Sequence, residues 1–304
     1  MIKYLEHHQI DKVKWDDCIS NSCNGIIYAY SWYLDIASPG WDALVENNYE
    51  SVFPLTKNKK YGIDYLFNPY FIQQLGLFSK EKILQVDLNN FLSAIPEQFK
   101  FIEINLNSEN KFVTPGFEQK QNLTHHLDLS ASYESISKNY SESLKRNLKK
   151  AYALKQTVAR NGYAPYIVVL FRTNRGKEIT KLKDRHYSQF EKTVEVALQK
   201  NFCEVYDVNN EKGNTIAGAI FMESNNKAVF IFSGSNSEAR DKFSMALLMD
   251  TYIRDHSGKN LILDFEGSND VNLARFYKSF GAKEIVYLQI KKNTLPFPLK
   301  FFKK

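Results

Sequence analysis

Two pairs of residues near the C-terminal end of the sequence carry side chains that could transfer protons or stabilise a developing charge. Asp264 and Glu266 follow an apolar segment, and Tyr277 and Lys278 are adjacent further along the chain. Forming an amide by acyl transfer requires an amine that has lost a proton, positive charge beside the tetrahedral oxyanion, and two oriented substrates. Lys278 could supply the charge, and either carboxylate could act as a base or bind the amine. Alternatively, Tyr277 could pack in the core, Lys278 could face solvent, and the carboxylates could cap helices.

The elements that must position these residues are predicted by the hydrophobic pattern between residues 228 and 290. Residues 228–232 and residues 261–263 with Phe265 are apolar segments typical of buried strands, and residues 285–290 predict a third strand. Apolar residues recur at helical spacing from 243 to 253 and from 270 to 280, and a glycine follows each segment. The short connections predict parallel strands joined by right-handed crossovers, with the strand ends and the helix starts at one edge.

The connection after the first of these strands carries the candidate cofactor-binding residues. Backbone N–H groups at the start of a helix attract phosphate or a developing oxyanion. Basic and hydroxyl side chains beside such a helix would add to this attraction. We therefore predict that a phosphate-bearing cofactor binds near Ser233, Gly234, Arg240, Lys242 and Ser244.

This order of elements, together with the sequence Tyr277-Lys-Ser-Phe-Gly281, resembles the acyl-CoA-dependent GNAT superfamily. In that family a strand leads into a helix that cradles the CoA pyrophosphate, and a later helix carries a tyrosine four residues before a glycine. The resemblance implies that Tyr277 donates a proton to the leaving thiolate. The glycine-containing phosphate loop of the family would fall on residues 240–245, which contain no glycine, and Asp270 stands where the family has asparagine.

A second resemblance is to the Fem-type (FemAB-like) branch, whose members transfer an aminoacyl group from aminoacyl-tRNA. It rests on the basic helix at residues 143–151 and on the aromatic-lysine cluster at residues 277–281, and it spans most of residues 133–290. The resemblance implies that Lys278 lies near the aminoacyl ester.

Basic residues are concentrated in the middle of the chain. Thirteen Lys and Arg residues stand against four Asp and Glu residues between positions 133 and 185, whereas the whole chain carries a formal charge of +6. Such a concentration favours either a solvated helix face or a surface for a phosphate-bearing partner such as tRNA or CoA. Lys145 and Arg146 are the candidate substrate-binding residues on this helix.

The N-terminal half predicts two helices, at residues 11–23 and 26–37, followed by an antiparallel meander over residues 41–67. Residues 68–78 are less regular, with Pro69 and Gly76 interrupting the pattern. This stretch is either a surface loop pinned by aromatic side chains or a loop that recognises the acceptor. In the second case the substrate-binding residues would be Tyr70, Gln73 and Gln74.

A similar order of elements returns after residue 130. The sequence predicts a strand at residues 166–171, a long helix at residues 176–200 and a meander over residues 202–232. We therefore predict an α/β (mixed α+β) fold with tandem GNAT-like domains, residues 1–130 and 131–304. Each domain would be a mixed, mostly antiparallel twisted sheet flanked by helices.

Composition narrows the remaining choices. No apolar run reaches the ~20 residues that span a bilayer, and the N-terminal residues lack the apolar stretch of a signal peptide, so we expect a cytoplasmic location. Three cysteines form neither a disulfide framework nor a metal-binding pattern, and no metal site is predicted.

Two classes of function follow. One is an acyltransferase that moves an acyl or aminoacyl group to a small-molecule or peptide amine, with no tightly bound cofactor and with acyl-CoA or aminoacyl-tRNA as co-substrate. The other is a non-catalytic GNAT-like binding module with a degenerate donor site.

Overall fold

The computed structural model describes residues 1–267 and 269–301, and the chain divides into two compact units. Unit 1 consists of Met1–Leu123 and Ile285–Lys304, and unit 2 consists of Thr124–Glu284. The chain passes into unit 2 within β8 (Glu118–Asp128) and returns within β14 (Lys283–Asn293). Among the described residues, no helix is both long enough and apolar enough to cross a membrane.

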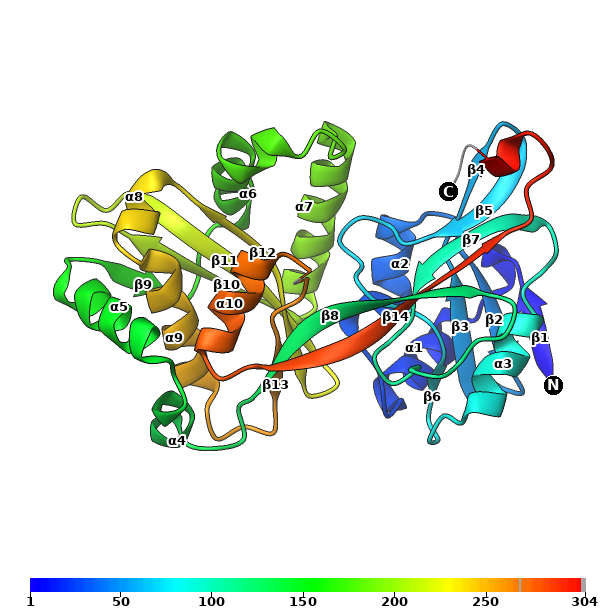
Figure 1. The fold of residues 1–304 in the computed structure, drawn as a ribbon, viewed down its shortest axis with the longest axis horizontal. Helices are drawn as coiled ribbons and strands as arrows, with labels where there is room; N and C mark the ends of the chain where they lie inside the picture. The colour runs from blue at the N-terminus through cyan, green and yellow to red at the C-terminus, as the bar shows by residue number, and fades with distance from the viewer. Residues whose placement is uncertain (268, 302–304) are drawn as a thin grey trace. The chain divides into compact units, whose positions relative to one another are not determined.

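Unit 1 contains two groups of strands (Figure 1). Strands β1, β2, β3 and β6 form an antiparallel sheet, and β4, β5, β7 and β14 follow one another in a second sheet, in which β5 and β7 are parallel. The core includes Phe53, Phe91, Ile104 and Ile290, all of them buried. The elements of unit 1 are β1 (Ile2–Leu5), η1 (His7–Gln9), α1 (Lys12–Asn21), η2 (Ile27–Ala29), α2 (Ser31–Ala37), β2 (Asp42–Glu46), β3 (Ser51–Leu55), β4 (Lys57–Lys60), β5 (Ile63–Phe67), β6 (Phe78–Ser79), α3 (Gln85–Ser93), β7 (Phe99–Asn105) and η4 (Leu299–Phe301).

Unit 2 is built on strands in the order β8-β13-β12-β11-β10-β9. Within this order β12 and β13 are parallel and the other neighbours are antiparallel. The elements are α4 (Tyr133–Lys138), α5 (Glu142–Ala153), β9 (Thr157–Ala159), α6 (Ala164–Thr173), η3 (Arg175–Glu178), α7 (Asp184–Gln199), β10 (Cys203–Asn209), β11 (Thr215–Ser224), β12 (Lys227–Ser235), α8 (Ser237–Asp241), α9 (Ser244–His256), β13 (Ile262–Asp264) and α10 (Val271–Ser279).

Helices cover both faces of the unit 2 sheet (Figure 1). On one face the Tyr252 ring of α9 stacks on Phe221 of β11, with 3.6 Å between ring centroids. On the other face Phe171 of α6 and Phe190 of α7 contact Phe232 of β12. Phe221 and Phe232 lie on opposite faces because Phe232 pairs with Ile220, and neighbouring strand residues point in opposite directions.

Residues 166–171 belong to helix α6 and do not form the strand that the sequence predicted. Pro165 stands in the first turn, where its missing N–H group leaves no helical hydrogen bond unmade. Ile167 is buried while Val169 is half exposed, as expected of a helix with one face on the sheet. The prediction was wrong because a short apolar run does not distinguish a strand from a buried helix.

Three further expectations differ from the structure. The predicted helix at residues 176–200 is divided into η3 and α7. The third predicted strand, β14, pairs with β7 in unit 1, while β13 pairs antiparallel with β8. Because β14 returns in this way, unit 2 ends at Glu284, whereas the sequence extended the second domain to residue 304. The mixed α/β fold class itself is confirmed.

Candidate functional site

A cavity of about 810 Å³ lies in unit 2 beside the part of β12 that continues beyond its pairing with β13. The register of these two strands covers only Lys227–Val229 of β12 and Ile262–Asp264 of β13, but β12 continues to Ser235. The last residues of β12 therefore form one wall, and α10 and the end of α6 form others. The lining residues are Phe171, Asn174, Arg175, Glu178, Ile179, Phe230, Ser233, Gly234, Ser235, Arg240, Met245, Leu273, Phe276 and Tyr277.

Tyr277 is buried in α10 and lines this cavity. Its ring stacks on Phe265, with 4.8 Å between centroids, and lies 5.9 Å from the ring of His125. Burial raises the pKa of the Tyr277 phenol, and the negative charge of Glu266 acts in the same direction. The phenol is therefore protonated at neutral pH. Within residues 1–267 and 269–301, the Tyr277 hydroxyl has no hydrogen-bond partner, so it is available to a bound molecule.

Two contacts hold the walls of the cavity. A Cβ atom on Gly234 would overlap the carbonyl oxygen of Ile167, so the absence of a side chain lets α6 lie directly on β12. The Arg175 guanidinium of η3 lies 3.3 Å from an Asp270 carboxylate oxygen. Asp270 is also the N-cap of α10, where it accepts hydrogen bonds from the backbone N–H groups of Asn272 and Leu273.

The predicted donor-binding residues separate into two groups. Ser233, Gly234 and Arg240 line the cavity. Lys242 is paired with Glu238 at 2.8 Å, and the buried Ser244 donates its hydroxyl hydrogen to Gln156.

The segment that precedes α9 contains no glycine, and side chains lie against its backbone. Phe243 takes a left-handed backbone conformation (φ 55°) immediately before the helix. The Gln156 amide donates to the carbonyl of Lys242 and accepts from Ser244, which lies on the first turn of α9.

The Asp264 carboxylate is held by neighbouring groups of the protein. Its fully buried carboxylate accepts hydrogen bonds from the Thr124 hydroxyl at 2.5 Å and from the Glu266 backbone N–H at 2.9 Å, and it lies 3.0 Å from His126 Nε2. Burial raises the pKa of Asp264, but the hydrogen bond and charge of His126 outweigh it and hold the pKa below its usual value. Neither Asp264 nor Glu266 is among the residues that line the cavity, although the Glu266 charge acts on Tyr277.

Lys278 lies on the exposed side of α10, with 49% of its side chain accessible. Its ammonium group is 2.6 Å from a carboxylate oxygen of Glu284. Lys278 does not line the cavity, so the role that the family resemblance implies for it stays a prediction.

The basic helix forms as predicted, as α5, with Ser141 as its N-cap. Lys145 is paired with Glu142 at 2.9 Å, whereas the exposed Arg146 makes no ion pair within the described residues. This face of α5 therefore keeps basic groups for a partner.

The candidate acceptor residues lie in unit 1, between β5 and β6. Tyr70 is 44% exposed, whereas Gln74 is fully buried. The Gln74 carbonyl oxygen accepts from the Ser108 backbone N–H, and its amide donates to Gln73. These contacts make Gln74 a structural residue of unit 1.

The fold has solved counterparts, whereas no protein-family model and no curated protein matches the sequence. A crystal structure of FemX superposes with a TM-score of 0.70 over 99% of both chains at 14% identity. The fold is similar to that of FemX. A protein of unknown function from Bacteroides thetaiotaomicron has a TM-score of 0.59 at 10% identity and covers 96% of this chain and 99% of its own. The C-terminal domain of a proposed lysylphosphatidylglycerol synthetase from Agrobacterium fabrum has a TM-score of 0.54 at 10% identity, with 96% and 94% covered.

The FemX-like fold brings residues to the cavity that the sequence analysis missed. Phe171, Asn174, Arg175 and Glu178 come from the end of α6 and from η3. They were overlooked because α6 was predicted to be a strand. Pro165 at the start of the segment was the available sequence signal, because proline is favoured in the first turn of a helix.

Proposed function

We propose that this protein is an acyltransferase that moves an acyl or aminoacyl group to an amine acceptor, and that the unit 2 cavity receives the donor. The observation that carries the proposal is the Tyr277 hydroxyl, a protonated donor that lines the cavity and lacks a protein partner among the described residues. The similarity to FemX and to a protein named for an aminoacyl lipid product supports the reaction class.

In the proposed reaction the amine nitrogen attacks the carbonyl carbon of the donor and forms a tetrahedral intermediate. The intermediate collapses when the bond between that carbon and the leaving oxygen or sulfur breaks. Tyr277 then gives its proton to the leaving atom and is reprotonated from solvent, while the amine loses its own proton to a base. Glu266 is the candidate base, because it directly follows Phe265, whose ring stacks on Tyr277.

Two features favour aminoacyl-tRNA over acyl-CoA as the donor. Phe243 and Gln156 occupy the segment where a glycine loop would expose backbone N–H groups to a pyrophosphate. The basic face of α5 offers Arg146 to a polyanion, and phosphate contacts of this kind supply affinity without base specificity. The acceptor would be a small molecule or a peptide with a free amine.

The test begins with a mass-spectrometric screen of amine acceptors against acyl-CoA and aminoacyl-tRNA donors. With a turned-over pair in hand, Tyr277→Phe should lower kcat about a hundredfold with little change in KM, because it removes a proton needed only in the transition state. Tyr140→Phe is the matched control, since Tyr140 is a buried tyrosine outside the cavity lining. Equal activity of the two variants would remove Tyr277 from the mechanism.

A non-catalytic binding module is the second candidate. The observation that favours it is that Asp264 and Lys278 are both engaged by neighbouring side chains outside the cavity. This candidate predicts that a donor binds without any product, with every donor–acceptor pair.

A further inference from the structure

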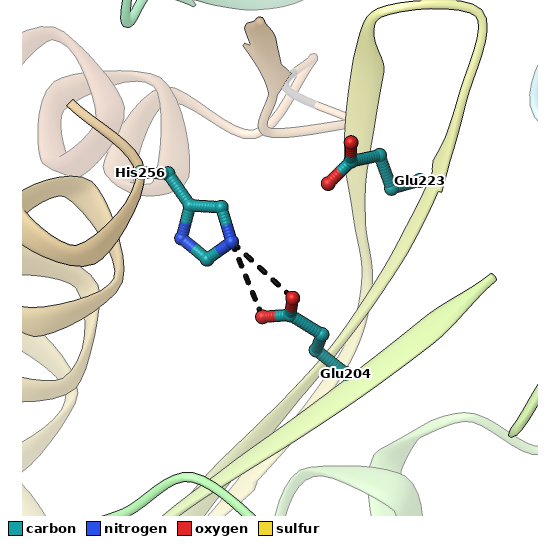
Figure 2. A group of neighbouring side chains, drawn as sticks. All are labelled: Glu204, Glu223 and His256. Atoms are coloured by element: carbon teal, nitrogen blue, oxygen red, sulfur yellow. Dashed lines mark hydrogen bonds and ion pairs between the residues drawn. The ribbon is translucent and has the colours of Figure 1, made fainter. Parts of the chain in front are cut away.

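Unit 2 contains a cluster of two glutamates and a histidine that the proposed reaction does not use. Glu204 lies on β10, Glu223 lies on β11, and His256 is the last residue of α9 (Figure 2). One potential ligand atom from each residue lies within 4.8 Å of the other two. The three positions are far apart in the sequence, so no short sequence motif predicted this cluster.

The sheet register places both glutamates on the face that α9 covers. Glu204 pairs with Phe221, and Glu223 follows Phe221 by two residues, so all three side chains share one face of the sheet. The Phe221 ring stacks on Tyr252, and the Tyr252 ring stacks on His256 at 4.1 Å. This aromatic stack fixes the imidazole above the two carboxylates.

The hydrogen bonds of His256 orient its second nitrogen towards the carboxylates. Nδ1 lies 2.9 Å from the carbonyl oxygen of Tyr252. A carbonyl oxygen can only accept, so Nδ1 carries the proton. In the neutral ring Nε2 then holds a lone pair, and it faces the Glu204 oxygens at 3.2 and 3.3 Å. The His256 side chain is only 3% exposed, so the imidazole itself is shielded from water.

We propose that Glu204, Glu223 and the Nε2 atom of His256 bind a divalent first-row transition-metal ion, with zinc as the representative. Imidazole and carboxylate are ligands that such ions accept, and a water molecule would complete a tetrahedral site. In metal-binding histidines, the ring nitrogen that does not bind the metal usually donates its N–H to a carboxylate, a backbone carbonyl or water. Nδ1 of His256 makes this contact with the carbonyl of Tyr252. The exposed ends of the two glutamates can move to the metal–oxygen distance of about 2.0–2.2 Å.

The charges of the cluster agree with a dication. With a neutral imidazole, two carboxylates and one dication sum to zero. Without an ion, an imidazolium and the two carboxylates would together keep a net charge of −1.

The position of the cluster points to a structural ion. His256 lies eleven positions after Met245, the residue of α9 that lines the cavity, which corresponds to about 16 Å of helix. The ion would fasten the C-terminal end of α9 to β10 and β11. The inference is therefore independent of the proposed acyltransferase reaction.

The test is calorimetric titration of the tag-free chain with Zn²⁺, alongside thermal unfolding with and without the ion. Every protein carries Cys23→Ser, because Cys23 is an exposed thiol that could bind zinc elsewhere. Glu223→Gln removes one ligand, and Glu195→Gln on α7 is the matched control for the lost charge.

We expect one ion per chain, a rise in Tm on binding, affinity at least tenfold weaker in Glu223→Gln, and unchanged affinity in Glu195→Gln. His256→Gln should lose the ion as well, and its folding is checked by circular dichroism. No zinc binding by the parent chain, equal affinity in the parent and Glu223→Gln, or equal weakening in Glu195→Gln would each overturn the proposal. The first of these outcomes would assign the cluster to an ion pair between a charged imidazole and Glu204.

Discussion

The Tyr277 hydroxyl and the Lys278 ammonium are neighbours in sequence but have different surroundings. Tyr277 is buried against Phe265 and His125 and lines the cavity, whereas Lys278 is half exposed and paired with Glu284. Adjacent helical residues point about 100° apart, so one helix can present one side chain to a cavity and the next to solvent. The two expected roles, proton donation by Tyr277 and oxyanion stabilisation by Lys278, can therefore be tested by separate substitutions.

Lys278→Ala is expected to lower turnover about a hundredfold and leave the fold intact, if the ammonium stabilises the oxyanion as the Fem-type resemblance implies. Steady-state kinetics and circular dichroism of the variant provide the measurement. Glu284→Gln is the control, because it removes the ion pair but keeps the lysine. Wild-type turnover in Lys278→Ala would reduce Lys278 to a surface charge.

His125 should make stability depend on pH. Burial lowers the pKa of His125, and the charge of Lys278 adds to this, while Glu284 and Asp264 oppose it. The unfolded chain then binds a proton at a higher pH than the folded chain, so stability is complete above the ordinary histidine pKa of 6.5 and is lost as the pH falls through the folded value.

Urea unfolding from about pH 8 to about pH 5 measures this loss. His125→Gln should flatten the slope without abolishing it, because the pKa of His186 is lowered in the same way. The exposed His8 provides the control substitution. An unchanged slope in His125→Gln would contradict the assignment.

At the scale of elements, the cavity exists because β12 is longer than its parallel partner β13 and α6 lies directly on β12. The pairing ends at Val229 and Asp264, and Gly234 lets α6 approach the strand. After β12 and the short helix α8, the first turn of α9 is crowded by Phe243 and Gln156. The cavity, which Met245 of α9 also lines, therefore lies beside a helix start whose backbone is surrounded by side chains.

Acetyl-CoA should bind weakly or not at all, because side chains occupy the place where backbone N–H groups would meet the pyrophosphate. Isothermal calorimetry is the measurement. A dissociation constant in the low micromolar range, roughly −8 kcal/mol, would contradict this expectation. Titration of acetyl-CoA into buffer alone controls for heats of dilution.

At the scale of the whole molecule, unit 1 is completed by a strand from the far end of the chain. Ile290 of β14 pairs with Ile104 of β7 and is fully buried in the core of unit 1. Unit 2 is therefore an insertion between two parts of unit 1 in sequence. The free energy of unfolding of unit 1 therefore depends on residues that follow unit 2 in the sequence.

Ile290→Ala should destabilise unit 1 by about 2–5 kcal/mol, because it leaves a cavity in a packed core. Hydrogen exchange should quicken in β7 and stay unchanged in β11. Ile253→Ala on α9 is the matched substitution in unit 2, and it should give the reverse pattern. Faster exchange in β11 after Ile290→Ala would show that β14 stabilises unit 2 instead.

The sequence by itself determined the elements whose pattern is local. Residues 228–232 form a short apolar run, apolar residues recur at helical spacing from 270 to 280, and Gly281 follows α10. The basic face of α5 is visible in the order of its residues. These signals depend on contacts within a few positions, so periodicity reports them.

The tertiary structure decided what depends on distant residues. The cavity requires α6 against Gly234, the environment of Asp264 requires Thr124 and His126, and the Glu204 cluster requires β10, β11 and α9 to meet. None of these has a sequence period, because each joins positions whose separation is set by strand pairing and not by local geometry. The side on which Lys278 lies was decided in the same way, by how α10 packs on Phe265 through Tyr277.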